Sequence, residues 1–385
     1  MMRSTSRLTR SFILTLLVVV RAFAQGATPA DAIALEQQGK WLEAAQAWRA
    51  VAERNPNDAG AFASLGVVLS KEQKYAEAAA AYRKALALNP KLPGVGLNLG
   101  LAEFKQGHFQ AATKALRAAL AQDPSSTQAQ TLLGLSYYGS KKFDLAAQSL
   151  EPVAKLAPAN TELQQVLAQS CLWAKKFDCA EQQFHKILET NPDSAAAHIL
   201  YGEALDGLRR YPEAIAEFEA AAKASPREPG VHFGLGFLYW KSQQYESARP
   251  EFDRELGIDP QQAQALAYIG DIEWKDNHPE AALSYLSRAA KIDPGLRLIH
   301  VDLGAIYLQR KDHKAAMVHL QRAIALDPTQ PDAHYQLGRL YQALGKPAEA
   351  GKELQKVQEL HEKIEDSLVG KIATSPPVLN PSEAK

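Results

Sequence analysis

The chain has 385 residues, of which 46% are hydrophobic and 22% charged, a composition typical of a folded protein and not of a disordered or collagen-like one. Basic and acidic residues number 43 each, so no global positive field favours binding to nucleic acid. Two cysteines are too few for a small disulfide-stapled fold or a four-cysteine zinc module.

Residues 1–24 have the order of a secretory signal peptide. Three arginines precede an apolar run from Phe12 to Val20, and a small-residue pattern ends at Ala24. The run is about half as long as the roughly 20 residues of a membrane-spanning helix, so an uncleaved anchor is the weaker interpretation. Arg21 is unusual so close to a cleavage site and keeps that alternative open. We expect cleavage near Ala24 and export to the periplasm or the exterior, with membrane contact only through an uncleaved segment.

A 34-residue period occupies the chain from Gln25 to about Ile364. Nine prolines recur at this spacing, namely Pro56, Pro90, Pro124, Pro158, Pro192, Pro226, Pro260, Pro294 and Pro328. Nine prolines in one register would arise by chance with a probability on the order of 10⁻¹⁰. An alanine recurs in the same way from Ala44 to Ala350, and a glycine or alanine stands twelve residues before each one. The pattern predicts ten structural units.

Each unit is predicted to contain two helices. In the third unit the first helix ends near Gly107, because glycine readily takes the left-handed conformation that leaves a helix. The second helix begins at Phe109, carries an apolar stripe through Leu116, and ends before Pro124, since proline cannot continue the helical hydrogen bonds. The small residue of the first helix and the alanine of the second allow the two backbones to approach closely.

These residues resemble the tetratricopeptide repeat family, whose 34-residue helix-turn-helix unit has the same small residue, alanine, aromatic residue and terminal proline. The resemblance covers residues 25–364 and implies an all-α fold, an α-solenoid superhelix of ten such units. Glu255 departs from the pattern, because a small or aliphatic residue should pack there. The tenth unit lacks its closing proline, so we expect its second helix to extend over residues 365–373 as a cap, followed by a disordered tail at 374–385.

Several first helices carry an apolar stripe beyond what packing within the repeat requires. Phe233, Phe237 and Trp240, for example, are spaced i, i+4 and i+7. By resemblance to the family, this face lines the inner, concave surface of the superhelix. Framework packing between adjacent first helices and a groove for a partner are both open interpretations. The candidate partner-binding residues are Leu97, Leu101, Phe104, Leu135, Tyr138, Trp173, Phe233, Phe237, Trp240, Tyr268 and Trp274.

A clamp for a partner's terminal carboxylate is not expected on this inner face. Family members with that function use a ring of Lys, Asn and Arg side chains. Here Asn98 and Lys105 are followed in later units by Leu, Tyr, Gln and Trp, which leaves the ring incomplete. A partner that inserts an apolar helix or an extended segment with bulky side chains fits the sequence better.

The sequence predicts no catalytic site, no metal site and no cofactor. His198, His232, His300 and His334 share one repeat position, but stacked helices lie roughly 8 to 10 Å apart, whereas nitrogens bound to one zinc ion each lie about 2.0 to 2.1 Å from it. We therefore interpret them as framework residues.

Cys171 and Cys179 lie on either side of the turn in the fifth unit. An oxidising compartment would favour a disulfide between them, and two free buried thiols are the alternative.

These features predict an exported, non-enzymatic scaffold that binds a partner protein or peptide in a cell-envelope complex. One alternative is a regulatory or substrate-delivery subunit of an envelope enzyme that acts on cell wall or glycans. Another is a carrier of an apolar small molecule. The sequence indicates neither the partner nor an oligomeric state.

Overall fold

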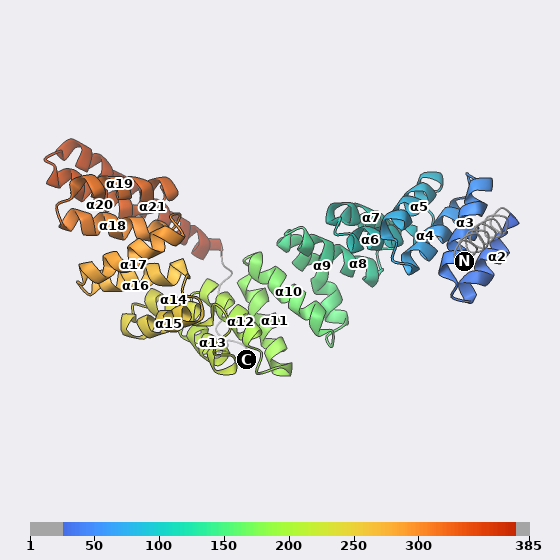
Figure 1. Ribbon diagram of the computed structural model, residues 1–385, viewed down its shortest axis with the longest axis horizontal. Coiled ribbons are helices and arrows are strands. Elements are labelled where there is room, and N and C mark those ends of the chain that lie inside the picture. Colours follow the sequence, from blue (N-terminus) through green and yellow to red (C-terminus); the bar gives the residue numbers. More distant parts are fainter. Residues whose placement is uncertain (1–25, 375–385) are drawn as a thin grey trace, which may run out of the picture. The chain divides into compact units, whose positions relative to one another are not determined.

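The computed structural model describes the backbone of residues 26–374 and the side chains of residues 26–363. The predicted signal peptide, and all of the predicted tail after Thr374, lie outside these residues. The described backbone contains twenty α-helices and no strand, which confirms the predicted all-α solenoid (Figure 1). The chain divides into two units, residues 1–192 and 193–385, and we describe each by itself.

Even-numbered helices are the first helices of the repeats, and odd-numbered helices are the second. The first unit contains α2 (Pro29–Gln37), α3 (Trp41–Arg54), α4 (Ala59–Lys71), α5 (Tyr75–Leu88), α6 (Val95–Lys105), α7 (Phe109–Gln122), α8 (Thr127–Gly139), α9 (Phe143–Leu156), α10 (Thr161–Trp173) and α11 (Phe177–Thr190). The second unit contains α12 (Ala195–Gly207), α13 (Tyr211–Ala224), α14 (Val231–Lys241), α15 (Tyr245–Ile258), α16 (Ala263–Lys275), α17 (Pro279–Ile292), α18 (Arg297–Gln309), α19 (His313–Leu326), α20 (Pro331–Ala343) and α21 (Pro347–Thr374).

The two helices of a repeat pack at the positions of the small residues. The recurring second-helix alanine has no exposed surface in any repeat from Ala44 to Ala316, and Ala350 is 2% exposed. Opposite it, the first-helix glycine receives a large side chain from the second helix. A Cβ atom added to Gly304 would lie 2.5 Å from Cδ2 of Leu320, so no side chain fits there without repacking.

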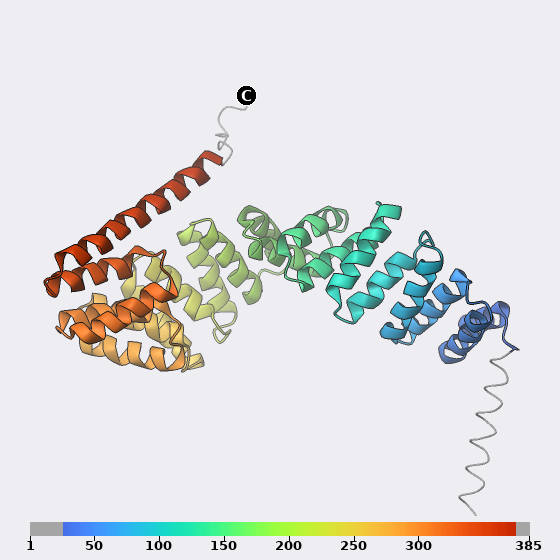
Figure 2. The ribbon, with the colours of Figure 1, turned by 90° about the horizontal axis from the view of Figure 1, so that it is seen from above.

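Within each unit, first helices are also covered by neighbouring repeats. Helix α6, for example, contacts the second helix of the preceding repeat, α5, and the first helices on either side, α4 and α8. The first helices thus form a continuous row from α4 to α10 in the first unit and from α12 to α20 in the second (Figures 1 and 2). Coverage on several sides explains why these helices are apolar over more than one face.

The turn between the two helices uses the left-handed conformation in all ten repeats. The residue with positive φ is Gly39, Gln73, Gly107, Lys141, Lys175, Arg209, Gln243, Asn277, Lys311 or Gly345. The prediction at Gly107 is therefore correct, but seven repeats place a residue other than glycine in this conformation. The backbone N–H of the following residue caps the end of the first helix by a hydrogen bond. In the fourth repeat, the Lys142 N–H donates to the carbonyl of Tyr137 at 2.9 Å.

The closing prolines end nine second helices, and the tenth continues. Each of the nine second helices from α3 to α19 has 14 residues, whereas α21 has 28 and reaches Thr374. Figure 2 shows α21, in red, extending well beyond the neighbouring helix. No proline follows the tenth repeat at the recurring position, so nothing in the sequence interrupts its hydrogen bonds there.

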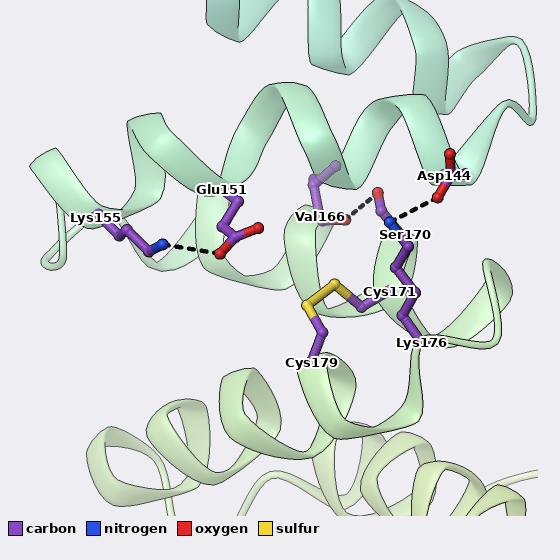
Figure 3. Close-up of a disulfide and its surroundings, with 8 residues drawn as sticks. All are labelled: Asp144, Glu151, Lys155, Val166, Ser170, Cys171, Lys176 and Cys179. Atoms are coloured by element: carbon purple, nitrogen blue, oxygen red, sulfur yellow. Dashed lines mark hydrogen bonds and ion pairs between the residues drawn. A yellow bond between two sulfur atoms is a disulfide. The ribbon is translucent and has the colours of Figure 1, made fainter. Parts of the chain in front are cut away.

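A disulfide joins the two helices of the fifth repeat (Figure 3). Cys171, in the last turn of α10, is bonded to Cys179, in the first turn of α11, with 5.7 Å between their Cα atoms. That separation lies within the usual range of about 4.4 to 6.8 Å. The bond spans the short turn that contains Lys175, and Cys171 is fully buried. Closing a loop of this length with a disulfide lowers the conformational entropy of the unfolded chain. The folded repeat is thereby stabilised by roughly 2 to 3 kcal/mol.

The recurring histidines bridge elements within and between repeats. Nδ1 of His232 lies 2.7 Å from a carboxylate oxygen of Glu251 on the second helix, and Nε2 lies 2.9 Å from the carbonyl oxygen of Pro226 in the preceding turn. These two contacts link the second helix of the repeat to the turn that precedes its first helix. His198 pairs with Glu217 and His334 with Glu353 at 2.6 Å each. The interpretation as framework residues agrees with these contacts.

His300 differs, because its second-helix partner is another histidine. The Nδ1 atoms of His300 and His319 lie 3.0 Å apart, so one nitrogen must donate and the other accept. Burial, followed by the proximity of His300, lowers the pKa of His319 from its ordinary value of 6.5. Tyr307 stacks on the His319 ring, with 5.5 Å between centroids.

The glycine position provides a direct test of close helix packing. Gly304→Ala should lower the free energy of unfolding by about 1 to 3 kcal/mol, because the new methyl group meets Leu320. Gly257→Ala is the matched control, since no atom lies within 4 Å of its added Cβ, and helix propensity should leave stability unchanged or raise it by up to about 1 kcal/mol. Urea denaturation followed by circular dichroism measures both. Equal effects of the two substitutions would contradict the packing argument.

The histidine pair predicts an acid-sensitive contact. The lowered pKa of His319 means that the unfolded chain binds its proton more readily, so stability should fall as the pH drops below about 6.5. His319→Glu recreates the His–Glu pair of the other repeats and should reduce this loss by about 1 kcal/mol. His361→Glu makes the same change on the exposed surface of α21 and should not reduce it. The melting temperatures of the unchanged protein and of the two variants are measured between pH 5 and pH 8. If all three lose stability equally as the pH falls, His319 is not the source of the acid sensitivity.

Candidate partner-binding surface

The candidate residues of the first unit lie on the row of first helices. Leu97, Leu101 and Phe104 on α6, and Tyr138 on α8, are half-buried and pack against the core formed by α7, α8 and α9. Leu135 on α8 is also half-buried. This part of the predicted stripe therefore contributes to the framework and keeps some of its surface accessible.

A cluster of three rings, which we call the Trp173 cluster, continues this surface. Trp173 at the end of α10 stacks on Tyr138 with 5.6 Å between centroids, and it lies 4.9 Å from the ring of Phe143. The Tyr138 hydroxyl donates to Gln169 Oε1 at 2.5 Å, and burial raises the pKa of Tyr138. Despite these contacts, 45% of Trp173 remains exposed. The cluster thus presents a large ring that packing already holds in place.

The second unit contains a larger group of rings, the Trp240 cluster, made of Phe233, Phe237 and Trp240 on α14 and Tyr268 on α16. Tyr268 is central, with centroid distances of 6.0 Å to Phe233, 5.5 Å to Phe237 and 4.8 Å to Trp240. All four residues are half-buried. The structure thus brings these four predicted residues together. Trp274, on the same helix as Tyr268, packs instead against the neighbouring core of α16, α17 and α18.

Charged side chains frame the Trp240 cluster and were not among the residues that the sequence singled out. The Trp240 indole N–H donates to an oxygen of Asp271 at 2.5 Å, and Lys275 pairs with the same carboxylate. The Lys275 ammonium also lies 5.0 Å from the centre of the Trp240 ring. Lys241 lies over Phe237 and pairs with Asp206 at 2.6 Å. Both lysines therefore already have carboxylate partners.

Asp302 adds a buried carboxyl group beside this cluster. It is only 5% exposed, and its Oδ2 atom has no hydrogen-bond partner within the described residues. Burial and the nearby charge of Asp271 raise its pKa well above the ordinary value. Burial, together with Asp271, also raises the pKa of Tyr268 to about 12. A spacing pattern could not reveal Asp302, because its neighbours come from adjacent repeats.

The described residues provide no evidence for a metal centre or a membrane span. Among residues 26–363, no group of three or more His, Cys, Asp or Glu side chains is arranged to hold a metal ion. None of the helices in the described part of the chain combines the length and apolar character that a bilayer crossing requires.

Comparisons with solved structures return several repeat proteins. MamA of MSR-1 is 27% identical with a TM-score of 0.39, and the match covers 43% of this chain and 95% of that one. MamA from Desulfovibrio magneticus RS-1 is 19% identical with a TM-score of 0.40, covering 44% of this chain and 95% of that one. YrrB, described as a TPR protein with an unusual peptide-binding site, is 21% identical with a TM-score of 0.37, covering 49% and 97%.

Family models provide the assignment. Models described as tetratricopeptide repeat match residues 30–93, 97–161, 168–229, 207–270 and 331–363, and one described as TPR repeat matches residues 304–345. No curated protein gives a significant match. The matched segments follow the 34-residue period and the helix pairs described above, and they show that the chain belongs to the tetratricopeptide repeat family.

Proposed function

We propose that this chain is an exported, non-catalytic scaffold that binds a protein or peptide partner in a cell-envelope complex. Membership of the tetratricopeptide repeat family supports the general role, because such arrays use extended surfaces built from successive repeats to bind other proteins. The binding surface in this proposal is the row of first helices in each unit, with the Trp173 cluster in the first unit and the Trp240 cluster in the second.

The observation that carries the proposal is the ring of Trp173. A tryptophan packed against two other aromatic rings yet 45% exposed offers a large apolar contact to a partner. Its position is already fixed by Tyr138 and Phe143, so little side-chain entropy is lost when a partner covers it. Tryptophan is also among the residues that contribute most to measured binding energies.

The charges around the Trp240 cluster indicate what kind of partner fits. Lys241 and Lys275 are neutralised by Asp206 and Asp271, so the cluster presents no unpaired positive charge to an acidic segment. The half-buried rings of this cluster, whose neighbouring lysines are already paired, offer an apolar surface that suits contact with bulky apolar side chains of a partner. The partner in this proposal therefore presents an apolar helix face or an extended segment with large side chains.

Two features support export. The order of charged, apolar and small residues in residues 1–24 is that of a signal peptide. The bond between Cys171 and Cys179 fits an oxidising compartment, since structural disulfides are rare where cellular thiols keep cysteines reduced.

Trp173→Glu tests the surface directly. The substitution should reduce partner recovery from envelope extract by about tenfold or more, because a buried tryptophan anchor at an interface contributes at least about 2 kcal/mol. Leu156→Glu is the matched control: Leu156 is 73% exposed at the end of α9 in the same unit, and its substitution should leave recovery unchanged. Quantitative affinity capture followed by mass spectrometry provides the measurement, with circular dichroism to confirm equal helicity. Equal recovery by both variants would exclude the Trp173 cluster as the binding site.

A further inference from the structure

The contact between α16 and α18 is a polar counterpart of the Trp240 cluster, one repeat further along the chain. The three rings that α14 contributes to that cluster are replaced, 34 residues later, by Ala267, Asp271 and Trp274 on α16. Tyr268 is replaced in the same way by Asp302 on α18. Because successive repeats stack alike, Asp302 faces α16 as Tyr268 faces α14. Two carboxyl groups and one indole therefore stand where the preceding repeat pair has four rings.

Three aspartates along this part of the row share two cations. Lys275 on α16 pairs with Asp271, and Arg297 at the start of α18 donates two hydrogen bonds to Asp332 at the start of α20. Asp302 lies on α18, the helix between α16 and α20. The charges that act on Asp302 are those of these four residues, two negative and two positive. Since those four charges compensate one another in pairs, Asp302 is the aspartate without a counter-charge.

Asp302 is buried without the partner that a buried carboxyl group normally has. The residue is only 5% exposed, and its Oδ2 atom receives no hydrogen bond from any described residue. Burial, followed by the charge of Asp271, raises its pKa well above the ordinary value, so the group resists ionisation in the free chain. Buried polar groups in folded proteins are nearly always hydrogen-bonded. The orphaned oxygen therefore points to a donor that comes from outside the chain.

The surroundings of Asp302 favour a planar cation as that donor. A guanidinium group carries five N–H donors, pairs with a carboxylate through two of them and stacks on aromatic rings, whereas an ammonium group has three donors around a point charge. The neighbouring pair of Arg297 and Asp332 already shows the two-bond geometry in this part of the array. Trp274, which is half-buried, supplies an indole at the place that Trp240 has beside Tyr268. A guanidinium beside Asp302 would also favour its ionised form.

We propose that Asp302 and Asp271, with the indole of Trp274 beside them, bind the guanidinium group of an arginine side chain of the partner. In the free chain, Lys275 occupies the Asp271 half of this site. The Lys275 side chain is 36% exposed and that of Asp271 is 5% exposed, so the arginine enters as the flexible lysine moves aside. The source of the arginine rests on the proposed function, because the partner carries it next to its apolar side chains.

Indole N–H signals of the full chain, with ¹⁵N-labelled tryptophan, test the site without any partner. Nα-acetylargininamide provides the guanidinium group, Nα-acetyllysinamide the ammonium group, and Nα-acetylcitrullinamide is the neutral isostere of the arginine compound. The Trp274 signal should shift saturably with the arginine compound, with a dissociation constant on the order of millimolar, less with the lysine compound and not with citrulline. Trp41 and Trp48 in the first unit should not respond. An unchanged Trp274 signal, or equal shifts with all three compounds, would overturn the proposal.

Two substitutions locate the response. Asp302→Asn keeps the shape of the side chain, removes its charge and should abolish the shift of Trp274. Asp276→Asn removes an exposed charge at the end of α16 and should leave the shift unchanged. Equal responses of the two folded variants would contradict the assignment to Asp302. If Asp302→Asn protein loses its helical circular dichroism, the contrast between the arginine and citrulline compounds in the unchanged chain decides the question by itself.

Failure of this titration is distinguishable from failure of the proposed function. The titration uses small compounds and reads the second unit, whereas Trp173→Glu tests recovery of the partner through the first unit. No response to the arginine compound would remove the arginine site and leave the scaffold role standing. Equal partner recovery by Trp173→Glu and its control would leave the arginine site standing.

Discussion

The close approach of two helix backbones in every repeat is the contact on which the rest of the structure depends. Gly304 and its counterparts leave room for a leucine or aromatic ring from the second helix, and the recurring alanine removes side-chain bulk on the other side. Dispersion and apolar burial at these contacts act over many atoms, so a single added methyl group is felt. Because each pair is compact, the next repeat can stack on it in the same way.

With these positions kept constant, other positions are free to differ from repeat to repeat. One such position holds a histidine paired with glutamate in repeats six, seven and ten, a histidine pair in repeat nine, and Gly96 in repeat three. Glu255 closes the start of α14 by accepting the N–H groups of Gly230 and Phe233, whereas Ala119 stands at the equivalent position of repeat three. A regular array thus acquires local chemistry by small substitutions at sites that the packing does not constrain.

The aromatic residues show that framework and recognition roles overlap on the first helices. Tyr268 contacts the other three rings of its cluster and packs against the core of α15 and α16, which is a structural role. Trp173 makes similar ring contacts but retains a large exposed area. Rings that are held in place before binding suit a scaffold, because a partner then meets an ordered surface.

The sequence by itself determined the period, the helix pairs and the helix ends at proline, because close packing requires small residues at fixed intervals and proline interrupts hydrogen bonds locally. The left-handed turn was predictable from Gly107, but not from Lys141 or Lys311, since these residues adopt it only because helices on both sides hold it. The partners of Glu255, the bond between Trp240 and Asp271, and the burial of Asp302 were decided by the tertiary structure. The hydrogen bonds among them join residues 22, 25 or 31 positions apart along the chain, and local spacing does not encode them.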